Sequence, residues 1–238
     1  MQNALADEFV VYSKLDDLED ASTTVLTSQI ENTKHQDTLS TSVGQRVFNY
    51  VVALIFLVIL APAMLCIMLI IKLDSPGPVF FRQPRIGLNN CVFRIWKFRT
   101  MHHRSSDTLG SQLTLRNDAR VTRAGVWLRK FSLDELPQLF NVLTGEMSIV
   151  GPRPHPIEAK AGSVLYADAV PHYSARHRVL PGITGWAQVN GWRGQTETLI
   201  QIQKRVDYDI DYLRRKSIWF DCKIIFLTFC RVWVDDAF

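Results

Sequence analysis

The chain has 238 residues, 47% of them apolar and 11% aromatic, so it can form one sizeable folded domain and is not disordered throughout. Its net charge of +4 is uneven, because residues 1–40 hold eight acidic side chains and only two lysines. The basic remainder suits anionic lipid, phosphate ligands or nucleic acid. The four cysteines show no CxxC spacing, so we expect no disulfides and a reducing compartment.

The first segment, residues 1–45, is polar and rich in Ser, Thr and Asp. This composition predicts a flexible acidic N-terminal tail. It has no basic region followed by an early apolar stretch, so we do not expect a cleaved signal peptide.

Residues 46–73 are expected to form a membrane helix. The 25 residues 47–71 carry no charge and lie between Arg46 and Lys72. A helix of this length can cross a hydrocarbon core of ~30 Å. The alternative, a buried core helix, seldom stays apolar on every face over such a length. Pro62, near the middle, removes a backbone hydrogen bond and should break or bend the helix.

Residues 74–238 are expected to form a cytoplasmic catalytic domain of the α+β class, mostly helical with a small β-hairpin. Proline and glycine at 76–78 end the membrane helix. The apolar patterns then predict strands at 79–82 and 91–99, and helices near 121–131, from 132–134 to 143, at 195–215 and at 218–234. The last helix mixes aromatics with charges and should lie on the bilayer surface.

Several common sites are missing from the sequence. There is no P-loop, no G-x-G-x-x-G and no H-E-x-x-H pattern, and the histidines lack metal-ligand spacing. Asp134 and Glu135 form the first acidic pair of interest. Ser132 and Glu135 also have the spacing of a capping box, and on the residues alone a helix cap and a catalytic pair are equally good interpretations.

Two further segments could carry chemistry. Asp207, Asp209 and Asp211 contain D-x-D twice, a pattern that many glycosyltransferases use to hold a metal, although a solvated helix face explains it better. Arg153 lies between prolines in a rigid loop, where a planar guanidinium suits bidentate capture of phosphate. A stiff turn with a surface arginine explains this loop equally well.

Read in order, several segments resemble the bacterial sugar transferase family, the polyprenyl-phosphate hexose-1-phosphate transferases or monotopic phosphoglycosyl transferases. The resemblance covers about residues 46–234. The motifs that carry it are Lys97-Phe98-Arg99-Thr100-Met101, Asn117-Asp118-x-Arg120-Val121-Thr122-Arg123, Ser132-Leu133-Asp134-Glu135-Leu136-Pro137-Gln138-Leu139-x-Asn141-Val142-Leu143, the segment 148–154, and Pro181-Gly182-Ile183-Thr184-Gly185-Trp186-Ala187-Gln188-Val189-Asn190-Gly191.

The resemblance implies roles for seven residues. Asp134 would attack the β-phosphate of a UDP-sugar and carry the phosphosugar covalently. Glu135 would help to hold Mg²⁺, which neutralises charge on the diphosphate. The remaining positions would contact phosphate or nucleotide or complete the site, and they are Lys97, Arg129, Arg153, Gln188 and Asp209.

The implied reaction transfers hexose 1-phosphate from the UDP-sugar to polyprenyl (undecaprenyl) phosphate and releases UMP, as the first membrane step of exopolysaccharide, capsule or O-antigen synthesis. The segment 191–198 resembles a stretch in family members that use UDP-glucose, and this resemblance favours glucose over galactose as the sugar. The resemblance implies the bacterial inner membrane, and a homodimer is compatible with it. Two rival classes are a conventional glycosyltransferase, which would release UDP, and a nucleic-acid-binding membrane protein. We do not expect the latter, because the arginines lie beside acids that repel a polyanion.

The course of the membrane helix stays open on the residues alone. A simple span is compatible with the positive-inside rule, because the tail has few basic residues. The resemblance favours a re-entrant helix with both ends in the cytoplasm. Small members of the family have Ser-Pro at the bend, whereas this chain has Ala61-Pro62 and so lacks the hydroxyl that can share a backbone bond there.

Overall fold

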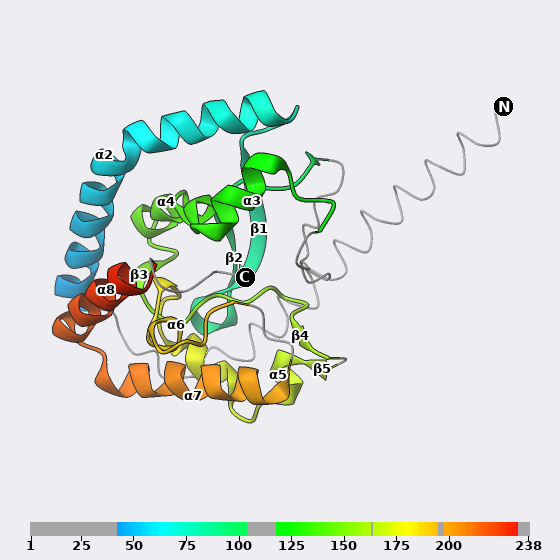
Figure 1. Cartoon of the computed structure of the whole chain (residues 1–238). Helices are drawn as coiled ribbons and strands as arrows, with labels where there is room; N and C mark the ends of the chain where they lie inside the picture. The colour runs from blue at the N-terminus through cyan, green and yellow to red at the C-terminus, as the bar shows by residue number, and fades with distance from the viewer. Residues whose placement is uncertain (1–41, 104–117, 163, 195–197, 233–238) are drawn as a thin grey trace, which may run out of the picture. The chain divides into compact units, whose positions relative to one another are not determined.

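The structure is a computed structural model that describes residues 42–103, 118–162, 164–194 and 198–232, with side chains described up to residue 230. These residues belong to one compact unit that runs from Thr38 to Phe238. The predicted tail therefore lies, up to residue 41, outside the described residues. The described part is mostly helical with three two-stranded sheets, which confirms the α+β class (Figure 1).

The helices of the described residues, three of them short 3₁₀ helices labelled η, are α2 (Val43–Asp74), η1 (Leu88–Asn90), α3 (Arg123–Lys130), η3 (Leu133–Glu135), α4 (Gln138–Leu143), α5 (Tyr166–Ala169), η4 (Tyr173–Arg178), α6 (Trp186–Val189), α7 (Leu199–Arg215) and α8 (Ile218–Val232). The strands are β1 (Phe80–Ile86), β2 (Val92–Phe98), β3 (Ser148–Val150), β4 (Lys160–Ala161), β5 (Val164–Leu165) and β6 (Gly182–Thr184).

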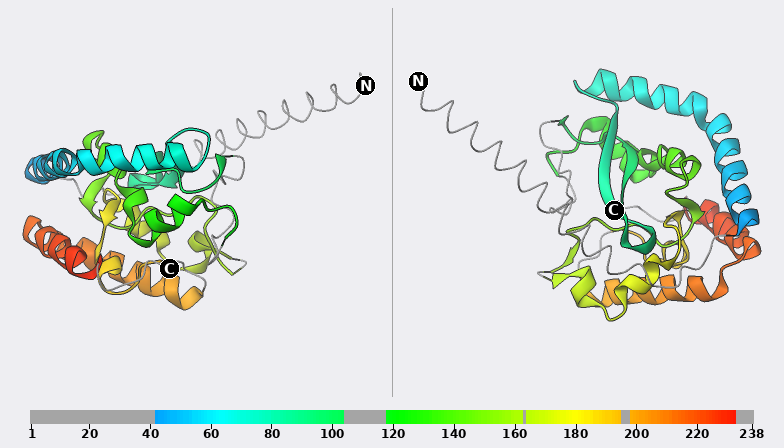
Figure 2. Two further views of the ribbon diagram at one scale, coloured as in Figure 1. Left: turned by 45° about the horizontal axis from the view of Figure 1, so that its top comes forward. Right: turned by 180° about the vertical axis from the view of Figure 1, so that it is seen from behind.

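Helix α2 is the long apolar helix predicted from the sequence, and it is bent. It begins after Ser42, whose side chain accepts a hydrogen bond from the Gln45 amide, and it contains Pro62. Figures 1 and 2 show the bend between its blue and cyan halves, in the part of the chain that holds this proline. The helix is long and apolar enough to cross a membrane, and only 17% of its most apolar window is buried.

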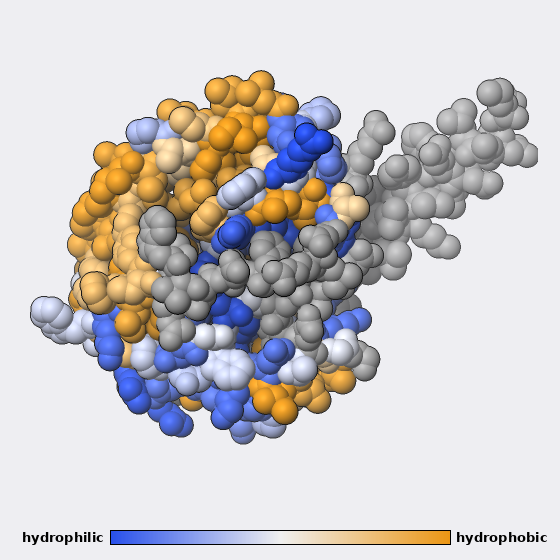
Figure 3. Space-filling view, viewed as in Figure 1, coloured by the Kyte–Doolittle hydropathy of each residue, from blue (hydrophilic) through white to orange (hydrophobic). Residues whose placement is uncertain are grey.

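Only one stripe of α2 packs against the rest of the unit. In its first half the buried residues are Gln45, Asn49 and Ala53, which lie four residues apart and so share one face. In its second half Met64 and Ile71 are buried in a cluster with Phe98 and Leu128. Many of its other apolar side chains, among them Leu54, Val58 and Leu65, are exposed and belong to the orange rim of Figure 3, so the helix presents a lipid-compatible surface.

The predicted hairpin is present. β1 and β2 are antiparallel, with Phe81 opposite Lys97. Asn89 and Asn90 have positive φ in the connection, a conformation that asparagine tolerates better than most residues. Directly after β2, the Arg99 guanidinium donates to the carbonyls of Ser75 and Pro76 at 2.6 and 2.8 Å. The end of α2 is thereby tied to the hairpin.

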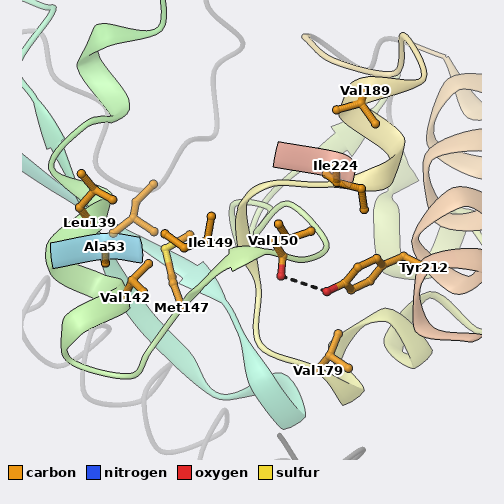
Figure 4. Packing of buried hydrophobic residues seen from close by; sticks show 11 residues of the cluster. Ala53, Leu139, Val142, Met147, Ile149, Val150, Val179, Val189, Tyr212 and Ile224 are labelled. Carbon is orange, nitrogen blue, oxygen red and sulfur yellow. Dashed lines mark hydrogen bonds between the residues drawn. The ribbon is translucent and has the colours of Figure 1, made fainter. Parts of the chain in front are cut away.

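The main core surrounds β3, which pairs in parallel with β6. Its buried side chains come from α2, α4, β3, α7 and α8, and Figure 4 shows them around the hydrogen bond from Tyr212 to the Val150 carbonyl. Burying each aliphatic side chain of this kind contributes roughly 1.5–3 kcal/mol. β3 leads directly into the loop that holds Arg153, so the core fixes the start of that loop.

The segment from Ser132 to Leu143 differs from the predicted single helix, and the capping box that was one interpretation of Ser132 and Glu135 is not formed. Ser132 is left-handed (φ 54°) and makes no capping hydrogen bond, and the chain forms the short turn η3 before α4 begins after Pro137. The physical reason is competition: the Glu135 carboxylate binds two cationic side chains instead of returning to the backbone of Ser132.

Candidate active site

Glu135 joins three separate elements. Its Oε1 lies 2.8 Å from Lys97 Nζ on β2. The Arg153 guanidinium binds both carboxylate oxygens, one of them at 2.9 Å from Nη1 to Oε2. Burial alone would raise the pKa of Glu135, but the charges of Arg153 and Lys97 outweigh it and hold the pKa well below its usual range. Glu135 is therefore an ionised, fixed carboxylate.

Asp134 lies beside this cluster but is held far less tightly. Its Oδ2 lies 3.7 Å from Lys97 Nζ, beyond hydrogen-bond distance. Its side chain is buried, and burial raises its pKa although the charge of Lys97 opposes the rise. Within the described structure, the carboxylate has this ion pair and no hydrogen bond. A carboxylate that is desolvated and not tied by donors has its lone pairs available for attack.

Arg129 comes from the last turn of α3 and precedes Asp134 in the sequence. Its Nε donates to Thr100 Oγ1 at 2.9 Å. Burial lowers its pKa, and the negative charge of Asp134 opposes this. Arg129 is thus a partly desolvated cation in the electrostatic range of Asp134.

Behind Arg153 lies a second, fully buried cluster. Arg176 Nη2 donates to the Arg153 carbonyl at 2.6 Å, and its Nε donates to Asp209 Oδ2 at 2.8 Å. His155 Nδ1 lies 2.6 Å from Tyr173 Oη and 3.0 Å from Arg176 Nη1. Burial and the charge of Arg176 keep the pKa of His155 well below its usual range. Through the hydrogen bond from Arg176 to the Arg153 carbonyl, the cluster holds the Arg153 loop in place.

The structure therefore brings together four of the seven predicted site residues, Lys97, Asp134, Glu135 and Arg153, and places Arg129 beside them. Asp209 supports the group through Arg176 and does not contact it directly. Gln188 is separate: its Nε2 lies 3.4 Å from the Ile183 carbonyl, and its buried Oε1 has no hydrogen-bond partner in the structure. A ligand donor could satisfy that oxygen.

Arg176 is the functional residue that the sequence reasoning missed. It lies 33 residues from Asp209 in the sequence, and no local motif links the two. Its neighbours from His172 to Arg178 include two histidines and a second arginine, so its charge does not single it out before the fold is known.

The three aspartates of the D-x-D pattern diverge on α7. Asp207 accepts from Gln203, whereas Asp209 is buried with Arg176 and Asp211 accepts from Trp186 Nε1 at 3.0 Å. Residues two apart on a helix point in nearly opposite directions. In the described part of the chain, no group of three or more His, Cys, Asp or Glu side chains is placed to hold a metal.

Comparison with known proteins gives consistent results. The sequence model of the bacterial sugar transferase family matches residues 40–235. The UDP-glucose:undecaprenyl-phosphate glucose-1-phosphate transferase of Escherichia coli (strain K12) is 50% identical over 193 residues, which are 81% of this chain and 41% of that protein. The UDP-N-acetylgalactosamine-undecaprenyl-phosphate N-acetylgalactosaminephosphotransferase of Aeromonas hydrophila is 41% identical over 77% of this chain and 42% of that protein.

A shorter relative matches over nearly its whole length. The exopolysaccharide production protein PSS of Rhizobium leguminosarum bv. phaseoli is 46% identical over 77% of this chain and 92% of its own length. The chain thus spans less than half of the two longer relatives and almost all of this one.

Proposed function

The chain belongs to the bacterial sugar transferase family, and from this premise we propose that it transfers hexose 1-phosphate from a UDP-sugar to undecaprenyl or another polyprenyl phosphate. The observation that carries the proposal is the contrast between two adjacent carboxylates. Glu135 is locked by Arg153 and Lys97, whereas Asp134 is desolvated and has no hydrogen bond within the described structure. One acid is positioned as a fixed charge and the other as a nucleophile.

In the proposed first step, an oxygen of Asp134 attacks the β-phosphorus of the UDP-sugar. A phosphorus–oxygen bond forms to the carboxylate, the bond to the bridging oxygen breaks, and UMP leaves with that oxygen. In the second step, the phosphate oxygen of the polyprenyl phosphate attacks the same phosphorus and displaces Asp134. The products are a polyprenyl diphosphate sugar and the regenerated carboxylate.

The cations have distinct tasks in this scheme. Arg153 is held at its backbone by Arg176, so its planar guanidinium is preorganised for bidentate contact with phosphate. Lys97 lies between both carboxylates and can neutralise charge on either side of the transferred group. Arg129 is available for a second phosphate near Asp134.

Mg²⁺ is proposed as the cofactor, with Glu135 as its protein ligand. A single carboxylate fits this ion, because Mg²⁺ in phosphoryl-transfer sites binds one or two carboxylates together with substrate phosphates and needs no closed cage of side chains. When bound, it would neutralise charge on the diphosphate and on the leaving group.

Glucose is the proposed sugar. The glucose-1-phosphate transferase of E. coli is 50% identical to this chain, against 41% for the N-acetylgalactosamine enzyme of A. hydrophila. The proposed site of action is the cytoplasmic face of the bacterial inner membrane, in exopolysaccharide, capsule or O-antigen synthesis. There both the nucleotide sugar and the lipid phosphate can reach Asp134.

The test follows the sugar and the nucleotide separately. Wild-type protein given UDP-glucose labelled in the sugar, with Mg²⁺ and no lipid acceptor, should retain label and release one equivalent of UMP. Asp134→Asn keeps the size of the side chain but is a poor nucleophile, so labelling and UMP release should fall by several orders of magnitude. Release of UDP, or full labelling of the Asn variant, would contradict the mechanism.

A further inference from the structure

Helix α3 exposes two aromatic rings close to the catalytic turn. Trp127 is 64% exposed and Phe131 is 41% exposed, and their rings stack at a centroid distance of 6.0 Å with 14° between the planes. Val126 beside them is 54% exposed. Burying an aromatic side chain contributes roughly 1.5–3 kcal/mol, so a stacked pair left in water leaves a large apolar area for a ligand.

The same helix carries cations beside the rings. Lys130 Nζ lies 5.9 Å from the centre of the Phe131 ring. Arg129 points the other way, to Thr100, and interacts electrostatically with Asp134. The exposed rings, the partly desolvated cation Arg129 and the proposed nucleophile Asp134 thus follow one another closely along the chain.

The chain geometry keeps these groups together. After Phe131 the left-handed Ser132 turns directly into η3, which holds Asp134. At its other end α3 is tied to α2, because the Ala124 amide donates to Asp74 Oδ2 at 3.1 Å. The last turns of α2 expose Leu69, Ile70 and Leu73. The helix that carries Trp127 therefore packs against the last part of the long apolar helix α2, where its Leu128 shares a cluster with Ile71.

On the basis of the proposed function, we propose that Trp127 and Phe131 bind the first isoprene units of the polyprenyl phosphate acceptor while Arg129 receives its phosphate. An acceptor of this kind has an apolar chain that ends in one anion, and α3 offers exposed apolar rings on one side and, on the other, the Arg129 cation within electrostatic range of Asp134. The charge complementarity extends to Lys130 at the rim. The lipid phosphate is thereby delivered to the phosphosugar on Asp134.

This assignment separates the aromatic pair from the other exposed rings. Trp219 on α8 is 86% exposed, and Phe226 and Phe229 on the same helix are exposed as well. Within the described residues, no hydrogen bond or ion pair joins α8 to the turn that holds Asp134. We assign the α8 rings to general contact with the bilayer, and Trp219 therefore gives a matched control for Trp127.

The experiment measures binding of labelled polyprenyl phosphate in detergent micelles without UDP-sugar, and then the Michaelis constant for this lipid in the complete reaction. Trp127→Ala should weaken both about tenfold, and Trp127→Phe should restore most of the loss. Trp219→Ala should leave both unchanged and lower the binding of protein to phosphatidylglycerol vesicles. Labelling of Asp134 from UDP-glucose serves as the folding control.

Three outcomes would overturn the assignment. Lipid binding by Trp127→Ala could equal that of the wild type, or both tryptophan variants could weaken it equally, which would show bulk bilayer contact only. The third outcome is that Trp127→Ala raises the Michaelis constant for UDP-glucose and leaves that for the lipid unchanged. Failure of wild-type protein to form labelled enzyme would instead refute the proposed function, and the binding measurement would still decide on the aromatic pair.

Discussion

Arg153 shows how one side chain can set the charge state of another. Its guanidinium binds both carboxylate oxygens of Glu135, and its backbone carbonyl accepts a hydrogen bond from Arg176. Arg153→Lys keeps the charge but cannot make both hydrogen bonds. Charge-assisted hydrogen bonds contribute ~1.5–3 kcal/mol each, so kcat/KM for UDP-glucose should fall roughly 10- to 100-fold. Arg214→Lys, an exposed position on α7, is the matched control and should retain wild-type kcat/KM.

The same pair predicts a pH effect. Arg153 and Lys97 hold the pKa of Glu135 well below its usual value, so ionised Glu135 persists in acid. Arg153→Ala removes the strongest of the charges that oppose burial and should raise the pKa of Glu135, because burial then dominates. The acid limb of the kcat/KM profile should move to higher pH in the Ala variant. An acid limb unchanged from wild type would show that Glu135 is not the group titrated there.

The catalytic group could be expected from the sequence only through the family resemblance. Lys97 and Arg153 lie 38 and 18 residues from Glu135, and no local period connects such positions. The residues alone left the acidic pair undecided between cap and catalyst. The fold speaks against the cap, because Ser132 makes no capping hydrogen bond and Glu135 binds Lys97 and Arg153 instead. Arg176 and its link to Asp209 could not be expected, because a buried ion pair depends on which distant segments the fold brings together.

At the scale of elements, the long periodic segments were predictable and the short ones were not. The membrane helix, the hairpin, α7 and α8 follow strong patterns, and the structure has them within a few residues of the expected limits. The strand pairs β3–β6 and β4–β5 were not predicted. Strands of two or three residues are too short to show a period, and β3 and β6 pair across the loop and turns that separate them.

A buried polar network ties α2 to α7 and α8. Gln45 Nε2 donates to Asp221 Oδ2 at 2.6 Å, and Tyr212 Oη lies 2.9 Å from Asp221 Oδ1 and 3.2 Å from the Val150 carbonyl. The single proton of Tyr212 cannot serve both acceptors. If Asp221 is protonated, it can donate to Tyr212, which then donates to Val150. In agreement with this, burial raises the pKa of Asp221 from 3.8 to about 6.

Asp221→Asn should therefore be tolerated and should stabilise the protein above pH 6. Between about pH 4 and pH 6 the folded wild type keeps a proton that the unfolded chain has lost, so its stability falls as the pH rises. The neutral amide of the Asp221→Asn variant has no such loss of stability. The free energy of unfolding of the variant can therefore exceed that of the wild type by up to ~3 kcal/mol more above pH 6 than below pH 4, for a pKa raised from 3.8 to about 6. Thermal unfolding across this range measures it, with Asp207→Asn at an exposed acid as control. A difference in stability between Asp221→Asn and the wild type that does not change with pH would refute the raised pKa of Asp221.

At the scale of the whole unit, both halves of α2 are fastened to the same catalytic domain. Near its start Asn49 Oδ1 accepts from Ser148 Oγ at 3.0 Å and from the Ile149 amide at 3.1 Å. Near its end Asp74 accepts from Ala124. If the helix crossed the bilayer, its first turns would lie at the far side of the membrane. Gln45 and Asn49 would then lose these partners. The contacts and the bend support our proposal that α2 is re-entrant.

This topology can be tested in cells with single cysteines in a background that lacks the native four. Val43 is 79% exposed at the start of α2, and Lys204 is exposed on α7. If α2 is re-entrant, Val43→Cys and Lys204→Cys should both be shielded from a membrane-impermeant thiol reagent in intact cells and both react after lysis. Labelling at position 43 alone in intact cells would show a true span. Pro62→Leu removes the cause of the bend and should shift part of the population to that labelled state, because a straight helix of this length matches the hydrocarbon thickness.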